Sequence, residues 1–188
     1  MKNELDRRVK YTIDILQKSL IALMQKKSIN RITVCELCNY SNIHRSTFYM
    51  HYKDIYDLLD EIEKNTYKDI EQFFCKDNLS DTDDTDMVLF MYYVRDNADV
   101  MRVLLRQDGS SSMIHFSKIL HAHYSKKWFN SIIFNPLEIT YLYEFLYSGI
   151  LGVIQKWLDT GCKDSPEAVA DIVWRIVKSA IFCNKNHA

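Results

Sequence analysis

Apolar residues recur at steps of three and four along most of the chain, and this spacing predicts amphipathic helices. Two long helices are expected at about 6–27 and 54–74. Further helices are expected at 86–96, 98–106, 112–131, from Asn135 to about Gly161, and from Ser165 onward. No convincing strand pattern occurs, and only four Gly and two Pro interrupt the 188 residues. The predicted fold class is therefore all-α, with about nine helices.

Two short helices are predicted between the first two long ones. Thr33 has Glu36 three residues later, which is the capping-box pattern, so a helix is expected to start at Thr33. Asn42 follows, and Asn tolerates the left-handed conformation of a tight turn. The second short helix covers about 44–51. Three helices of this kind form a helix-turn-helix, whose second short helix enters the major groove of DNA.

The long helix near the C-terminus has clear start and stop signals. Asn135 precedes Pro136, and Glu138 follows as the third helical residue, so Asn135 is the expected N-cap. Gly161 suits the end of that helix.

An Asp-rich segment at 76–86 is expected to be a solvated connector. A calcium loop is the alternative, but the central Gly and terminal Glu of an EF-hand are absent. We therefore predict a helix-turn-helix domain at 1–53, a connecting helix at 54–74, and a second domain at 75–188.

The net charge of −1 hides an asymmetry along the chain. Residues 1–53 hold ten Lys/Arg against four Asp/Glu, a balance of +6. Residues 54–188 hold fourteen against twenty-one, a balance of −7. A basic N-terminal segment, called the head below, followed by an acidic remainder indicates that the N-terminal segment binds a polyanion.

The second short helix carries side chains suited to DNA contact. Arg45, Ser46 and Thr47 are the best candidates for reading base edges, and Arg45 could bind guanine through two hydrogen bonds. Apolar residues are expected to pack this helix on its neighbours: Ile43, Phe48 and Tyr52.

The same residues carry a resemblance to a known family. The run Ile32-Thr33-Val34, followed by Ser46-Thr47-Phe48-Tyr49-Met50-His51-Tyr52-Lys53-Asp54 and Leu58-Leu59, resembles the TetR-family signature around its recognition helix. The stretch from Tyr143 to Gly161 is similar to the C-terminal region of a subgroup that includes regulators resembling the dihydroxyacetone-kinase activator.

The resemblance implies phosphate contacts for four residues: Thr33, Tyr49, His51 and Lys53. Plain packing is the alternative for Tyr49, and capping of the short helix is the alternative for His51. The sequence departs from the family pattern at two positions. Asn42 stands where the family has Gly, and Ile55 replaces a Lys that would contact a phosphate.

The resemblance also implies an effector pocket among the helices of the second domain. Its candidate lining combines apolar bodies with a few polar tips, namely Tyr92, Tyr93, Met101, His115, Phe116, Ile119, Tyr141 and Phe145. Ordinary core is the alternative for such an aromatic stripe. The sequence identifies no ligand.

The resemblance further implies a homodimer whose interface is formed by the last two helices. The candidate residues are small or apolar: Gly149, Gly152, Val169, Ile172, Val173, Ile176, Val177 and Ala180. Packing inside the protomer is the alternative for the two Gly residues.

Metal, cofactor and enzyme chemistry find little support. Cys35 and Cys38 form a CxxC pair, but no second pair completes a zinc site. His115, His121 and His123 lie near one another in the sequence, but on a helix His121 and His123 point to different sides. No nucleophile elbow, phosphate-binding Gly loop, HExxH or carboxylate pair in a recognisable context occurs, so we expect no enzyme and no cofactor.

We expect a cytoplasmic protein, because no 18-residue uninterrupted apolar run and no signal-peptide pattern occur. The predicted function is a DNA-binding transcriptional regulator, a homodimer whose affinity for a double-stranded operator is modulated by a small molecule. The alternative is a protein-interaction module with a helix-turn-helix head that has lost DNA binding or ligand response. Ile55 is the only support for that alternative.

Overall fold

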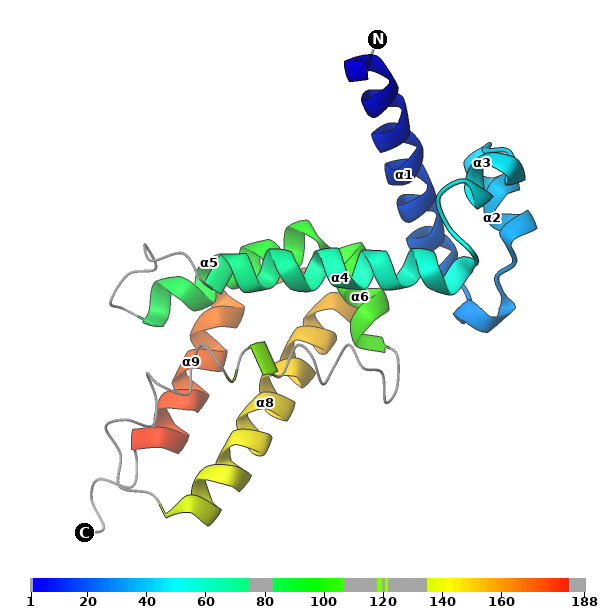
Figure 1. Cartoon of the computed structure of the whole chain (residues 1–188). Coiled ribbons are helices and arrows are strands. Elements are labelled where there is room, and N and C mark those ends of the chain that lie inside the picture. Colours follow the sequence, from blue (N-terminus) through cyan, green and yellow to red (C-terminus); the bar gives the residue numbers. More distant parts are fainter. Residues whose placement is uncertain (1, 75–82, 107–117, 120, 122–134, 183–188) are drawn as a thin grey trace. The chain divides into compact units, whose positions relative to one another are not determined.

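The computed structural model describes residues 2–74, 83–106, 118–119, 121 and 135–182. Its elements, shown in Figure 1, are α1 (Lys2–Met24), the 3-10 turn η1 (Ile29–Arg31), α2 (Val34–Ser41), α3 (Arg45–Tyr49), α4 (Ile55–Phe74), α5 (Asp83–Asp96), α6 (Ala98–Arg106), α8 (Pro136–Asp159) and α9 (Pro166–Phe182). None of these residues forms a strand. The all-α prediction is confirmed.

The chain divides into two compact units, Met1–Thr66 and Tyr67–Ala188. The boundary lies inside α4, the helix that the sequence assigned to connect the two domains. The first half of α4 therefore belongs to the head, and the second half to the C-terminal unit.

Two helix boundaries differ from the sequence prediction. Helix α1 covers Lys2–Met24, whereas 6–27 was expected. Helix α5 begins at Asp83, so residues 83–86 of the supposed connector are helical. Aspartates are favourable in a first helical turn because they face the positive end of the helix dipole, and the connector prediction overlooked this. Most of the helix expected at 112–131 lies outside the described residues.

The local signals at helix ends are confirmed. The Thr33 side chain accepts a hydrogen bond from the Glu36 backbone N–H, and Asn42 adopts the left-handed conformation with φ 55°. Asn135 and Glu138 form a complete capping box at the start of α8. Gly161, with φ 77°, follows the end of α8, and this conformation favours glycine.

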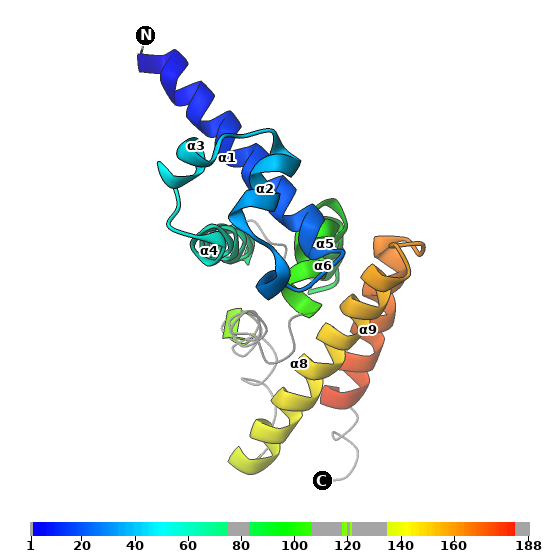
Figure 2. The same cartoon turned by 90° about the vertical axis from the view of Figure 1, so that its right-hand side faces the viewer.

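The C-terminal unit is held by helix packing around one apolar core. Helices α8 and α9 run side by side in opposite directions (Figure 2), and α9 also packs on α5. Arg102 of α6 donates to the Leu158 carbonyl near the end of α8, at 2.9 and 3.3 Å. Gln155 donates to the Leu105 carbonyl at 2.6 Å, so α6 and α8 are also joined by polar contacts.

Candidate nucleic-acid interface

The head places α3 on a small apolar core. Phe48 of α3 is fully buried together with Leu16 of α1, Leu37 of α2 and Leu58 of α4. The Tyr52 ring lies 5.7 Å from the Phe48 ring. Because one face of α3 is fixed in this way, its opposite face is presented to solvent in a defined orientation.

Tyr52 follows α3 and is buried in the head, near Glu61 of α4. Burial, followed by the nearby Glu61 carboxylate, raises the pKa of the Tyr52 hydroxyl. Glu61 accepts a hydrogen bond from Gln17 of α1 at 3.3 Å, which joins α1 to α4. Because its pKa is raised, the Tyr52 hydroxyl stays protonated at physiological pH.

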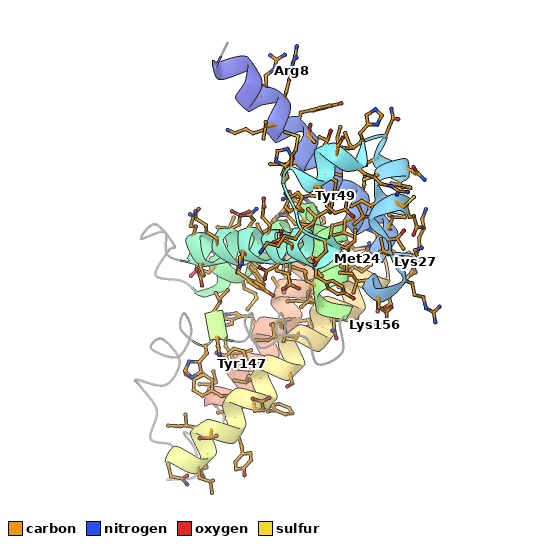
Figure 3. The ribbon with its side chains drawn as sticks, turned by 45° about the vertical axis from the view of Figure 1, so that its right-hand side comes forward. Arg8, Met24, Lys27, Tyr49, Tyr147 and Lys156 are labelled. Carbon is orange, nitrogen blue, oxygen red and sulfur yellow. The ribbon has the colours of Figure 1, made fainter. Side chains whose placement is uncertain are left out.

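The predicted base readers on α3 differ in their exposure. Arg45 and Ser46 are exposed and Thr47 is half-buried. Tyr49, labelled in Figure 3, is exposed. Its ring packs edge-on against that of Phe48, with the two ring centroids 5.4 Å apart. The contact with Phe48 thus restricts the orientation of the Tyr49 ring, although most of the Tyr49 side chain is exposed to solvent.

A contact with α2 positions the side chain of Arg45. The Arg45 guanidinium donates to the Cys35 thiol of α2. Arg45 therefore leans towards α2 rather than straight outward from α3.

Both cysteines of the CxxC pair lie on α2, within the head. Cys38 is buried in the head, and burial raises the pKa of its thiol. No group of three His, Cys, Asp or Glu residues with metal-site geometry occurs among the described residues. Of the three histidines near residue 120, His115 and His123 lie outside these residues. The ring of His121 lies 4.4 Å from that of Tyr143.

The residues with implied phosphate contacts lie at the ends of the short helices. Thr33 caps the start of α2, where backbone N–H groups and the positive end of the helix dipole favour an anion. Lys53 is exposed, and its backbone N–H donates to the Asp57 carboxylate at 2.9 Å. His51 is half-buried after α3.

The departure at Ile55 has a packing reason. Asp54 accepts hydrogen bonds from the backbone N–H groups of Tyr56 and Asp57, so it caps α4. Ile55 is the first helical residue and is buried in the head. The side chain at this position supports the fold of the head, and the adjacent Lys53 supplies an exposed positive charge.

Sequence reasoning did not select Met50 as a site residue. Met50 follows α3 directly, and its side chain is 78% exposed. The available signal was its spacing of four residues from Ser46, which puts both side chains on one helix face. The search for polar base readers passed over an apolar residue.

The candidate pocket residues fall in different environments of the C-terminal unit. Met101 and Ile119 are buried in its core. Tyr93 is packed against that core, and burial, followed by the charge of Asp69, raises its pKa to about 12. The Tyr92 hydroxyl donates to Glu167 of α9.

Two further pocket candidates lie on an exposed face of α8. Tyr141 is 70% and Phe145 is 67% exposed. His115 and Phe116 lie outside the described residues. The described residues thus bring only part of the candidate set together, in the core.

The candidate dimer residues separate into two faces of the last two helices. Val169, Val173 and Val177 are buried in the core of their own unit, and Ala180 packs against it. Ile172 and Ile176 are exposed on α9. Gly149 and Gly152 are exposed on α8, and no neighbouring heavy atom lies within 4 Å of a Cβ built at either position.

The exposed face of α8 is apolar over several turns. Leu137, Tyr141 and Phe145 are all exposed and follow one another at steps of four residues. Helix α8 is long and apolar enough, by length and composition, to cross a membrane, but only 33% of its most apolar window is buried. One helix of this kind is weak evidence for a membrane span, because the core helix of a soluble protein passes the same test.

Comparison with known proteins places these helices in a family. Residues 85–179, half of the chain, match the TetR_C_8 family model, a transcriptional regulator C-terminal region. A curated relative, the uncharacterized HTH-type transcriptional regulator YxbF of Bacillus subtilis (strain 168), is 24% identical over 184 residues. The match covers 90% of this chain but 45% of YxbF, so the chain spans about half the length of this relative.

Two solved structures share the fold. A TetR transcriptional regulator from Streptococcus agalactiae 2603V is 22% identical with a TM-score of 0.69, over 94% of this chain and 99% of that chain. The dihydroxyacetone kinase operon activator DhaS is 19% identical with a TM-score of 0.58, over 90% and 96% of the two chains.

Proposed function

The chain belongs to the TetR family of transcriptional regulators, and on this premise we propose that it binds a DNA operator as a homodimer under the control of a small molecule. The observation that carries the proposal is the outward face of α3, which lies opposite the buried Phe48. That face belongs to a head with a charge balance of +6 over residues 1–53.

In this proposal, one set of residues in the head contacts DNA phosphates and another set contacts base edges. Thr33, Tyr49, His51 and Lys53 contact phosphates, and these contacts fix the register of α3 on the duplex. Arg45, Ser46 and Thr47 read base edges in the major groove. Arg45 leaves Cys35 to reach a base, which exchanges one weak contact with a thiol for two hydrogen bonds to guanine.

The exposed face of α8 and α9 supports a two-fold dimer. Leu137, Tyr141 and Phe145 form an apolar stripe that continues to Gly149 and Gly152, where a partner helix could approach closely. Ile172 and Ile176 extend the apolar surface on α9. A two-fold axis would pair this surface with itself and carry two α3 helices to successive turns of DNA.

The small molecule would act by shifting the dimer between forms with different operator affinity. We place its site in the C-terminal unit, which matches the C-terminal region of transcriptional regulators of the family and lies apart from the DNA-reading head in the sequence. We also propose that the chain acts in the cytoplasm. The alternative of an interaction module without DNA binding rested on Ile55, which the packing of the head explains.

The DNA-binding proposal is tested by titrating salt against duplex binding. The logarithm of the affinity should fall linearly with the logarithm of salt concentration, with a slope of about 0.9 per phosphate contact, because bound counterions are released. Lys53→Ala should reduce that slope by about one. Fluorescence anisotropy with labelled genomic duplexes measures both quantities.

Lys163→Ala is the matched control, since Lys163 is an exposed lysine in the turn between α8 and α9 of the C-terminal unit. It should leave the slope unchanged. Binding that does not depend on salt, or no binding to any genomic fragment at any salt concentration, would contradict the proposal.

A further inference from the structure

Met50 follows the last residue of α3. Of the residues from Arg45 to Met50 that have a large apolar side chain, it is the most exposed. Its side chain is 78% exposed, against 57% for Tyr49 and 0% for Phe48. Its backbone remains helical, with φ −72° and ψ −22°, and its N–H donates to the Ser46 carbonyl at 3.2 Å. Met50 therefore continues the turn of α3 and does not support the core of the head.

The helical register places Met50 on the outermost line of α3. At about 100° per residue, Ser46 and Met50 both point about 160° away from the buried Phe48, on either side of the outward direction. Tyr49 lies about 100° from Phe48, and Arg45 about 60°, on the side where it contacts Cys35. The two side chains that face most directly away from the head are thus a hydroxyl and a thioether.

Among the groups exposed in the major groove, the thymine methyl group is the one that offers a thioether side chain an apolar contact. Three of the four bases present only hydrogen-bonding groups and ring edges there, whereas thymine adds the apolar C5-methyl group. Methionine is unbranched and polarizable, and it adapts its shape to an apolar partner. Burying this side chain against a phosphate or a donor would gain little, but contact with a methyl group removes apolar surface from water on both sides.

We propose that Met50 is a specificity-determining residue that selects a thymine in each half-site by contact with its C5-methyl group. This assignment rests on the proposed DNA binding by α3. Ser46, one helical turn earlier on the same line, then reads the neighbouring part of the same half-site. The head thus reads the half-site in two ways. Met50 selects a thymine through an apolar contact, and the polar residues of α3 form hydrogen bonds with other base edges.

Replacing thymine by uracil tests the proposal, because uracil pairs like thymine but lacks the methyl group. A duplex recovered by selection from a random pool is resynthesised with uracil at each thymine in turn. For the wild-type protein, each half-site should contain one thymine at which a single uracil substitution weakens binding about fourfold. This is the effect of losing one apolar methyl contact. For Met50→Ala, uracil and thymine at that position should bind equally well.

Ser46→Ala provides the matched control on the same line of α3, and it should keep the uracil sensitivity at the Met50 position. Circular dichroism checks that each variant is folded. The proposal is overturned if no thymine is sensitive to uracil, or if Met50→Ala retains the wild-type sensitivity. Failure of the wild-type protein to bind any duplex would contradict the proposed function as well, so the two failures are distinguishable.

Discussion

Replacing Phe145 by Glu should convert the dimer to monomers and abolish tight operator binding. Phe145 is 67% exposed on the apolar face of α8, one turn before Gly149. In a two-fold dimer each substitution occurs twice, so two carboxylates would lose their hydration inside an apolar interface. An unpaired buried charge costs several kcal/mol, which is a large share of the free energy of a dimer contact. A monomer holds one half-site only and loses the contribution of the second.

Sedimentation at micromolar concentration measures the first effect, and gel-shift titration of the operator measures the second. Ile176→Asp should act in the same way from α9, because Ile176 is also exposed. Lys163→Glu is the matched control, since it introduces a glutamate at an exposed position of the turn between α8 and α9. A wild-type monomer that binds its operator tightly at these concentrations would refute the dimer.

Replacing Arg45 by Ala should relax the preference for one base pair in each half-site, at a cost of about 1–3 kcal/mol in operator affinity. The reason is that Arg45 would lose its two hydrogen bonds to guanine while the phosphate contacts of the head remain. Random DNA should be bound almost as well as by the wild-type protein.

Tyr49→Phe is the matched comparison on the same helix. The ring remains packed against Phe48, and only the hydroxyl that we assign to a phosphate is lost. Binding to the operator and to random DNA should therefore fall by the same factor. Competition titrations with both duplexes measure the two effects. If Arg45→Ala weakens binding to both duplexes equally, Arg45 is a phosphate contact.

Several helix ends, in the head and in the C-terminal unit, could be predicted because their signals are local. Thr33, Asn42 and Asn135 act through hydrogen bonds or backbone conformations that involve only a few neighbouring residues. The start of α5 was missed for a related reason. The aspartates at 83–86 are polar enough for a connector and equally suited to a first helical turn, and composition alone does not separate the two.

The faces of α8 and α9 could not be assigned from the sequence. Helical spacing shows that a stripe is apolar, but it does not show what covers that stripe. Val173 and Ile176 belonged to one predicted set, and the structure buries the first and exposes the second. Phe145 was selected for its type as a pocket residue, and its exposure on α8 now supports a contact between protomers. Met50 was not predicted because base readers were expected among polar residues, although its spacing of four residues from Ser46 placed it on the same helix face.

Selection of bound duplexes from a random pool tests the central claim most directly, because it combines the reading head and the dimer in one measurement. A dimer of two α3 helices should recover a near-palindrome, whose half-sites lie about 34–36 Å apart, one turn of DNA, or a multiple of that distance. Each half-site should hold a thymine that contacts Met50. Recovery of no enriched sequence, or of a single unrepeated half-site, would contradict the account.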